Sequence, residues 1–182
     1  MTLFHIPSSG EILLWDNIEE LHALVGKIDS LFRDFPDKFK SSMLLAQEIK
    51  NYILQIDPFI DTYSKKVCPL CTNICCLNKN SRYEYDDLIY VVALRETFPF
   101  PERNLSEKEP CYLLSERGCT VPRYLRPLRC NWYICKDLLK EMESAPARVF
   151  REFSNIFNKM LYVRQQMLTS FFQSLSGIQN CI

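Results

Sequence analysis

The chain has 182 residues, of which 47% are hydrophobic, and its formal net charge is zero. A chain of this length and composition can bury the core of one domain without help from disulfides. Its charge balance leaves no basic excess to neutralise a phosphate backbone, so we expect no nucleic-acid partner. No apolar run approaches the roughly 20 residues of a membrane span and no secretory signal is recognisable, so we expect a cytoplasmic protein without a membrane segment.

Two amphipathic helices are predicted in the first third of the chain. From about 11 to 33 and again from about 37 to 56, apolar residues recur every three or four positions, which is the period of a helix with one buried face. Pro36 interrupts the pattern between them, and we expect Asp57-Pro58 to end the second helix. The apolar stripes comprise Leu14, Ile18, Leu21, Val25, Ile28 and Leu31 in the first helix, and Phe39, Met43, Ala46, Ile49, Ile53 and Ile56 in the second.

The middle of the chain predicts little regular structure. A short helix is expected from about 86 to 97, with Asp86 or Asp87 as its N-cap. Residues 98–130 contain five prolines and no sustained hydrophobic period, which indicates an irregular segment.

A third long helix is predicted from about 146 to 175, with Gly177 as its stop. Its apolar face is wide because it carries two rows, namely Val149, Phe153, Ile156, Met160, Val163 and Met167, and beside them Phe150, Phe157, Leu161, Leu168 and Phe172. We expect this helix to pack on the first two helices. The width of the face also makes it the expected seam of a homodimer.

Three helical windows and almost no period-two alternation predict an all-α fold. We expect a single domain over residues 1–182, in which a helical scaffold is formed by 11–57 and 146–176. A cysteine-rich, irregular, metal-binding insert at 68–135 interrupts this scaffold.

Eight of the nine cysteines lie in that insert. Two thiols separated by two residues, as Cys68 and Cys71 are, can face one metal from a tight turn. The side chains of the adjacent Cys75 and Cys76 diverge, so these two are expected to serve two metals of one cluster or two separate sites. The expected metal ligands are Cys68, Cys71, Cys75, Cys76, Cys111, Cys119, Cys130 and Cys135, whereas Cys181 is expected to be a free thiol.

Several interpretations of this cysteine set are open. Four disulfides and one unpaired cysteine are disfavoured by the odd count, by the lack of an export signal and by the adjacent Cys75-Cys76 pair. Soft thiolates favour zinc or iron–sulfur over magnesium or calcium, and eight of them match two four-sulfur zinc sites or one iron–sulfur cluster with spare ligands. We favour the iron–sulfur cluster, because His5 and His22 lie far from the cysteines in sequence and mixed Cys/His ligation would have indicated zinc.

Arginines gather among the last four cysteines. We expect Arg126 and Arg129, together with Tyr124, to surround the metal, where arginines offset the negative charge of thiolates and donate hydrogen bonds to sulfur. The alternative is an anion or carboxylate site built on Arg126 and Arg129.

Three short patterns follow one another in the insert. They read Cys-x2-Cys-x3-Cys-Cys at 68–76, then Cys-Tyr-Leu at 111–113 with Gly-Cys at 118–119, then Tyr-Leu-Arg-Pro-Leu-Arg-Cys at 124–130. Together they resemble the CxxCxxCC family, also called the YkgJ-type cysteine-cluster proteins. The resemblance implies a zinc- or iron-chelating domain, since many members are called iron–sulfur proteins, and a related cysteine cluster occurs in flagellin lysine N-methylases.

Motifs of the common enzyme classes are missing from the sequence. Four scattered glycines cannot form a phosphate-binding loop, and a radical-type Cys-x3-Cys-x2-Cys would need a cysteine where Asn78 stands. We therefore predict a metal-binding protein that holds an iron–sulfur cluster and serves electron transfer, sensing or cluster handling with a protein partner. The alternatives are a zinc-organised interaction module and, on the resemblance alone, a lysine N-methylase-like enzyme.

Overall fold

The structure is a computed structural model that describes residues 17–72 and 74–179. Within these ranges the chain forms six α-helices: α1 (Ile18–Asp34), α2 (Pro36–Val67), α3 (Tyr85–Ala93), α4 (Leu128–Trp132), α5 (Lys136–Glu143) and α6 (Ala147–Gln179). Three short 3-10 turns accompany them, η1 (Cys68–Leu70), η2 (Asn78–Asn80) and η3 (Arg123–Leu125). The only sheet in this part of the chain is the antiparallel pair β1 (Leu114–Ser115) and β2 (Gly118–Cys119). The predicted all-α fold is confirmed.

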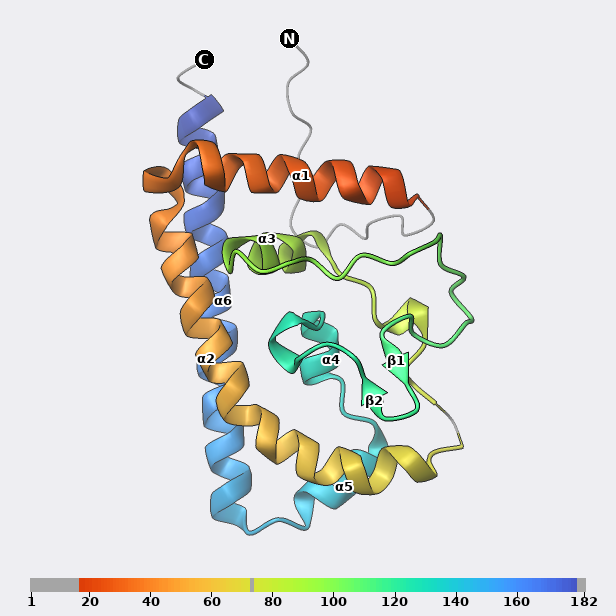
Figure 1. Ribbon diagram of the computed structural model, residues 1–182. Coiled ribbons are helices and arrows are strands. Elements are labelled where there is room, and N and C mark those ends of the chain that lie inside the picture. Colours follow the sequence, from red (N-terminus) through yellow and green to blue (C-terminus); the bar gives the residue numbers. More distant parts are fainter. Residues whose placement is uncertain (1–16, 73, 180–182) are drawn as a thin grey trace.

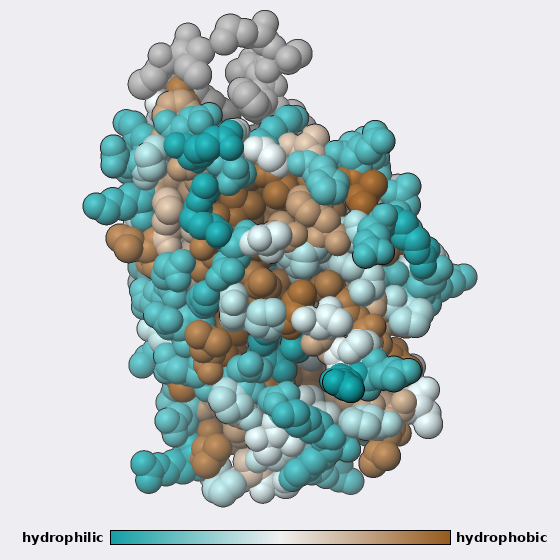
Figure 2. All heavy atoms as spheres, in the orientation of Figure 1, coloured by the Kyte–Doolittle hydropathy of each residue, from teal (hydrophilic) through white to brown (hydrophobic). Residues whose placement is uncertain are grey.

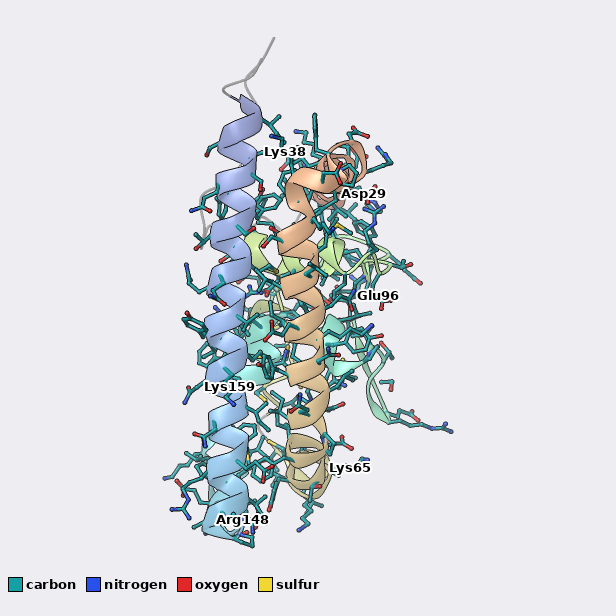
Figure 3. The ribbon with its side chains drawn as sticks, turned by 90° about the vertical axis from the view of Figure 1, so that its left-hand side faces the viewer. Asp29, Lys38, Lys65, Glu96, Arg148 and Lys159 are labelled. Carbon is teal, nitrogen blue, oxygen red and sulfur yellow. The ribbon has the colours of Figure 1, made fainter. Side chains whose placement is uncertain are left out.

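Helices α2 and α6 lie side by side and form the long axis of the molecule, which we call the α2–α6 frame (Figures 1 and 3). Their shared core is apolar, and it includes the fully buried Phe39, Ala46, Met160 and Met167. Phe39 and Phe171 have ring centroids 5.2 Å apart, and Phe32 of α1 lies 5.7 Å from Phe171. This aromatic group joins α1 to the end of the frame at which α6 finishes (Figure 1).

Helix α2 does not end at Asp57-Pro58, so that prediction was wrong. Proline lacks the N–H that would bond to the preceding turn, but the helix continues because its following residues are packed. Ile60 is buried, and the Phe59 ring stacks on Phe153 of α6 at 4.7 Å. The continued helix bends away from α6 in Figure 1 and delivers Cys68 to the other side of the molecule.

Other predicted helix limits also need correction. Gly177 does not stop α6, which runs to Gln179 with Ile178 buried against the core. The N-cap of α3 is Glu84 rather than Asp86 or Asp87, because Asp87 lies at the third helical position and accepts the Glu84 backbone N–H. The predicted start of the first helix, from 11 to 16, lies outside the described residues, and α5 was not predicted at all.

Helix α3 is the most deeply buried helix among the described residues. It lies between α1 and the frame, and its residues from Asp87 to Ala93 are all buried. Because α3 is enclosed on several sides, its apolar residues do not follow one narrow stripe. This burial explains why its sequence pattern predicted the helix only approximately.

One carboxylate ties α3 to two other helices. Asp87 Oδ1 accepts hydrogen bonds from Arg164 of α6 at 2.9 Å and from the Leu128 backbone N–H of α4 at 3.1 Å, while Oδ2 accepts the Glu84 N–H. Burial raises the pKa of the Asp87 carboxyl, and Arg164 and the two amides act against that rise. Asp87 therefore fixes α4, which carries Cys130, against α3 and the frame.

The outer surface of α6 offers little unpacked apolar area. Of its second apolar row, Leu168 is buried and Phe150, Phe157 and Phe172 pack against the core, which leaves Leu161 exposed beside Tyr162. The predicted homodimer seam therefore has few free apolar side chains on the described part of α6. Every helix in the described ranges is too short or too polar to traverse a lipid bilayer.

Candidate metal centre

The structure gathers the cysteine segment, residues 68–135, on one side of the α2–α6 frame (Figure 1). Four stretches of chain supply its thiols: the end of α2 with the following loop, the approach to β1, strand β2, and the stretch from α4 to the start of α5. The eight cysteines of this segment are all free rather than disulfide-bonded, and they are Cys68, Cys71, Cys75, Cys76, Cys111, Cys119, Cys130 and Cys135. Cys181 lies outside the described residues.

Backbone hydrogen bonds bring three of these cysteines together. The Cys111 N–H donates to the Cys76 carbonyl at 3.0 Å, next to the bridge that pairs Leu77 with Pro110. The Leu114 N–H donates to the Cys111 carbonyl at 2.8 Å, and Leu114 is paired with Cys119 across the hairpin. Cys76, Cys111 and Cys119 are therefore neighbours through the backbone itself.

Cys130 is the fourth member of this group. Burial raises its pKa to about 12, the thiols of Cys111, Cys119 and Cys76 add to the rise, and Arg126 opposes it. The pKa of Cys130 therefore responds to the same three cysteines whose backbones are linked through hydrogen bonds. We call Cys76, Cys111, Cys119 and Cys130 the inner set.

The other four cysteines form the outer set: Cys68, Cys71, Cys75 and Cys135. Burial raises the pKa of Cys68, with further contributions from the thiols of Cys75, Cys135 and Cys71. Burial also raises the pKa of Cys75, and Cys135 is the next largest cause. Cys135 directly precedes α5, which packs on α2, and Cys68 directly follows α2.

The two sets meet at Cys75 and Cys76. The pKa of Cys76 is raised to about 12 by burial first and then by the thiols of Cys75, Cys68 and Cys111, which belong to both sets. Cys76 is exposed as a residue, although burial is the first cause of the raised pKa of its thiol. The pKa of Cys76 therefore responds to thiols of both sets.

The donor chemistry fits a thiolate-bound metal. All eight candidate ligands are sulfurs, and soft metals such as zinc and the iron of iron–sulfur clusters prefer such ligands. In residues 17–72 and 74–179, no group of three or more Cys, His, Asp or Glu side chains is arranged to hold an ion as it stands. Within these described ranges the thiols do not form a coordination shell.

Arg126, Arg129 and Tyr124, which were predicted around the metal, each contact a different partner. Arg126 lies close enough to Cys130 to lower its pKa, and its Nε donates to the Val121 carbonyl at 3.1 Å. Arg129 pairs with Glu84 at 3.4 Å. The Tyr124 ring lies under Lys50 Nζ of α2, at 4.2 Å from the ring centroid.

Arg123 is one of the arginines that gather among the last four cysteines, although the sequence did not indicate a place for it beside Arg126 and Arg129 around the metal. It is buried, its Nε lies 2.5 Å from Asp57 Oδ1 of α2, and it acts to lower the pKa of Cys68. The pair joins η3 to the bend of α2. Asp57 and Arg123 are 66 positions apart, so no local pattern could have matched them.

Asn78 organises the loops of the cysteine segment and was likewise missed. Its buried side chain donates to the Ser106 carbonyl at 2.9 Å and accepts the Tyr112 N–H at 3.0 Å, while its own N–H donates to the Glu109 carbonyl. Asn80 adds a bond from its Nδ2 to the Cys75 carbonyl at 2.9 Å. These bonds hold the loop of Cys75 and Cys76 against the approach to Cys111.

Two tyrosines lie beside the inner set. The Tyr83 hydroxyl donates to the Leu125 carbonyl at 2.6 Å, and the Tyr112 hydroxyl donates to the Pro99 carbonyl at 2.8 Å. Burial raises the pKa of both, and the thiols of Cys119 and Cys130 are among the further causes. The two hydroxyl hydrogen bonds therefore tie loops of the cysteine segment to one another.

Asn131, directly after Cys130, has a buried polar group without a partner. The residue is 2% exposed, and neither its amide nitrogen nor its amide oxygen has a hydrogen-bond partner among the described residues. Buried amides are rarely left unsatisfied, and such exceptions call for an explanation such as an ion or ligand. An amide at this place could donate a hydrogen bond to a metal-bound sulfur.

No family model matches the chain, and neither a curated protein nor a solved structure matches it. The resemblance to the YkgJ-type family, and the ligand set that it implies, therefore stay predictions.

Proposed function

We propose that this protein binds metal through the eight cysteines of the cysteine segment, and that the bound group is an iron–sulfur cluster. The observation that supports the proposal is that four separate stretches of chain, which carry eight free thiols, lie on the same side of the α2–α6 frame (Figure 1). Thiols that ionise near one another all become negatively charged, so each raises the pKa of the others and the thiolate form is disfavoured. A bound cation offsets that charge.

Two features favour iron–sulfur as the bound group. The donor set contains thiols only, and the buried Tyr83 and half-buried Tyr112 belong to the same segment, where burial of a cluster is one of the factors that set its potential. An iron–sulfur cluster supplies one-electron redox chemistry when bound. The chain's own residues then hold it and offset its charge with Arg123 and Arg126.

In this proposal the protein works in a reducing, cytoplasmic environment, where thiols persist, and it transfers electrons, senses redox state or handles clusters together with a protein partner. Zinc is the second candidate. It is favoured by the division of the thiols into two groups of four, because a structural zinc ion takes four thiolates in a tetrahedron.

Elemental analysis of protein purified without oxygen tests the proposal. We expect coloured protein that carries iron and labile sulfide in similar amounts, whereas colourless protein with about two zinc ions per chain would decide for zinc. Cys68→Ser and Cys130→Ser should each lower the metal content, and Cys181→Ser, outside the cysteine segment, is the matched control. Protein without metal after anaerobic purification and reconstitution would overturn the proposal.

A further inference from the structure

A groove lies between α2 and α6 at the end of the α2–α6 frame where α6 begins. Its volume is about 510 Å³, and it is open to solvent rather than enclosed. Gln55 of α2 lines one side, and the first half of α6 lines the other. We call it the α6 groove, and its exposed polar lining comprises Gln55, Arg148, Arg151, Glu152, Asn155 and Lys159.

The α6 groove carries an excess of positive charge. Arg148, Arg151 and Lys159 are exposed, and none of these three cations forms an ion pair with a described residue. Glu152 is the one carboxylate among the described residues that line the groove. The groove is therefore locally cationic in a chain whose formal net charge is zero.

The cations of the groove are not placed to stabilise α6. Arg148 and Arg151 lie at the start of this helix, where the helix dipole favours acids and disfavours cations. Apart from Glu152, the described residues of α6 include neither Asp nor Glu, so the helix itself offers little to offset these charges. An anionic partner in the groove would offset them.

We propose that the α6 groove binds an acidic peptide segment of a partner protein. Arg148 and Lys159 are 11 positions apart on one helix, as Figure 3 shows on the part of α6 beside α2. At a helical rise of about 1.5 Å per residue, this row of cations is about 16 Å long. One carboxylate or phosphate is too short to contact both ends, whereas an extended peptide of about five residues spans the row at roughly 3.3 Å per residue.

The shape and composition of the groove favour a peptide over other anions. Small ligands bind in pockets that bury most of their surface, and the α6 groove is open. Duplex DNA is commonly held by about six or more phosphate contacts, and the groove has three cations. The amides of Gln55 and Asn155 can donate to and accept from a peptide backbone.

Charge should dominate binding in this groove. On the face shown in Figure 2, hydrophobic patches are visible between hydrophilic side chains. In the α6 groove, by contrast, the half-buried Ile156 is the one apolar side chain among the described residues of the lining. Exposed charges are screened by salt, so added salt should weaken the binding of an acidic peptide.

Titration of the full chain with a synthetic peptide tests the proposal. The probe is a fluorescently labelled peptide of alternating Glu and Ser, with a Gln-Ser peptide as the uncharged control, and fluorescence anisotropy reports binding. We expect saturable binding of the Glu-Ser peptide that weakens roughly tenfold when salt is raised from low to physiological strength and beyond. The Gln-Ser peptide should not bind.

Charge reversal locates the binding site. Arg151→Glu/Lys159→Glu should weaken binding of the Glu-Ser peptide by roughly tenfold or more, and this variant should instead bind a Lys-Ser peptide. Lys38→Glu/Lys40→Glu makes the same change of charge at exposed positions of α2 outside the groove, and should leave the affinity within about twofold.

An absence of saturable binding, or an equal loss of affinity in both double variants, would overturn the proposal. Tighter binding of single-stranded RNA, or of vesicles containing phosphatidylserine, that is lost in Arg151→Glu/Lys159→Glu would also overturn it, because the groove would then serve a different class of partner. The proposed metal-binding function would stand in each case, since no cysteine lines the described groove.

Discussion

The α2–α6 frame and the cysteine segment differ in what holds each of them in place. The frame has two helices of 32 and 33 residues that bury a continuous apolar core against each other. Outside α3 and α4, the cysteine segment has two-residue strands and three-residue turns, and its order depends on single polar contacts such as those of Asn78, Tyr83 and Tyr112.

This difference separates stability from function in the molecule. Apolar packing in the frame is spread over many residues, so the loss of one side chain lowers stability without displacing a helix. In the loops each hydrogen bond fixes a chain position near a thiol, so the loss of one bond moves a candidate ligand. The frame and α3 therefore provide a stable base, and the loops of the cysteine segment are the part whose order should respond to metal.

Truncation of one ring in the aromatic group of Phe32, Phe39 and Phe171 should destabilise the α2–α6 frame. Phe171 is fully buried and packs against Phe32 and Phe39, so Phe171→Ala should lower the free energy of unfolding by about 4 kcal/mol through lost apolar contact and a cavity. Denaturant titration measures the change. Thr169→Ala, at an exposed position of the same helix, is the control, and an equally small effect for both variants would contradict the role given to this group.

Loss of Arg164 should break the junction between the frame and the cysteine segment. Arg164→Leu leaves Asp87 buried without its cation, which should cost about 3 kcal/mol. The double variant Asp87→Asn/Arg164→Leu should recover part of that loss, because no unpaired charge then remains buried. If the double variant were as unstable as the sum of the two single variants, the ion pair would not be the cause.

Loss of Asn78 should affect the cysteine segment alone. Asn78→Ala removes the acceptor of the Tyr112 N–H and the donor to the Ser106 carbonyl, and should cost about 2 kcal/mol. Hydrogen exchange should quicken in residues 74–80 and 106–112 and stay slow in the buried turns of α2 and α6. Asn155→Ala on exposed α6 surface is the control, and faster exchange throughout the frame would show that the two regions are not separable.

Gly26 should give the smallest effect, and in the stabilising direction. It lies inside α1, is exposed, and has open space where a Cβ would be placed, so Gly26→Ala should raise the free energy of unfolding by about 0.5 to 1 kcal/mol. Gly177→Ala, near the end of α6 where the helix frays, should give less. A lower free energy of unfolding for Gly26→Ala would contradict the open space beside Gly26 on this face of α1.

The sequence predicted the parts of the fold that depend on local periodicity. The three-four repeats located α1, α2 and α6 and gave the all-α class, because a helix that buries one face needs apolar residues at that spacing. The helix ends that were predicted from proline and glycine were wrong at Pro58 and at Gly177. Beyond Pro58, the packing of Phe59 and Ile60 outweighs the cost of a proline inside a helix. Beyond Gly177, the burial of Ile178 outweighs the low helix propensity of glycine.

For the candidate site, the sequence by itself determined which residues can bind a soft metal, since the identity and spacing of the thiols are written in the chain. It also indicated that Cys75 and Cys76 serve different metals or sites. Only the tertiary structure decided which contacts, made by Asn78, Arg123 and Asp87, position the chain segments that carry the cysteines. Those contacts join residues that are tens of positions apart, and they arise because α3 and the bend of α2 bring distant loops together, which no local pattern encodes.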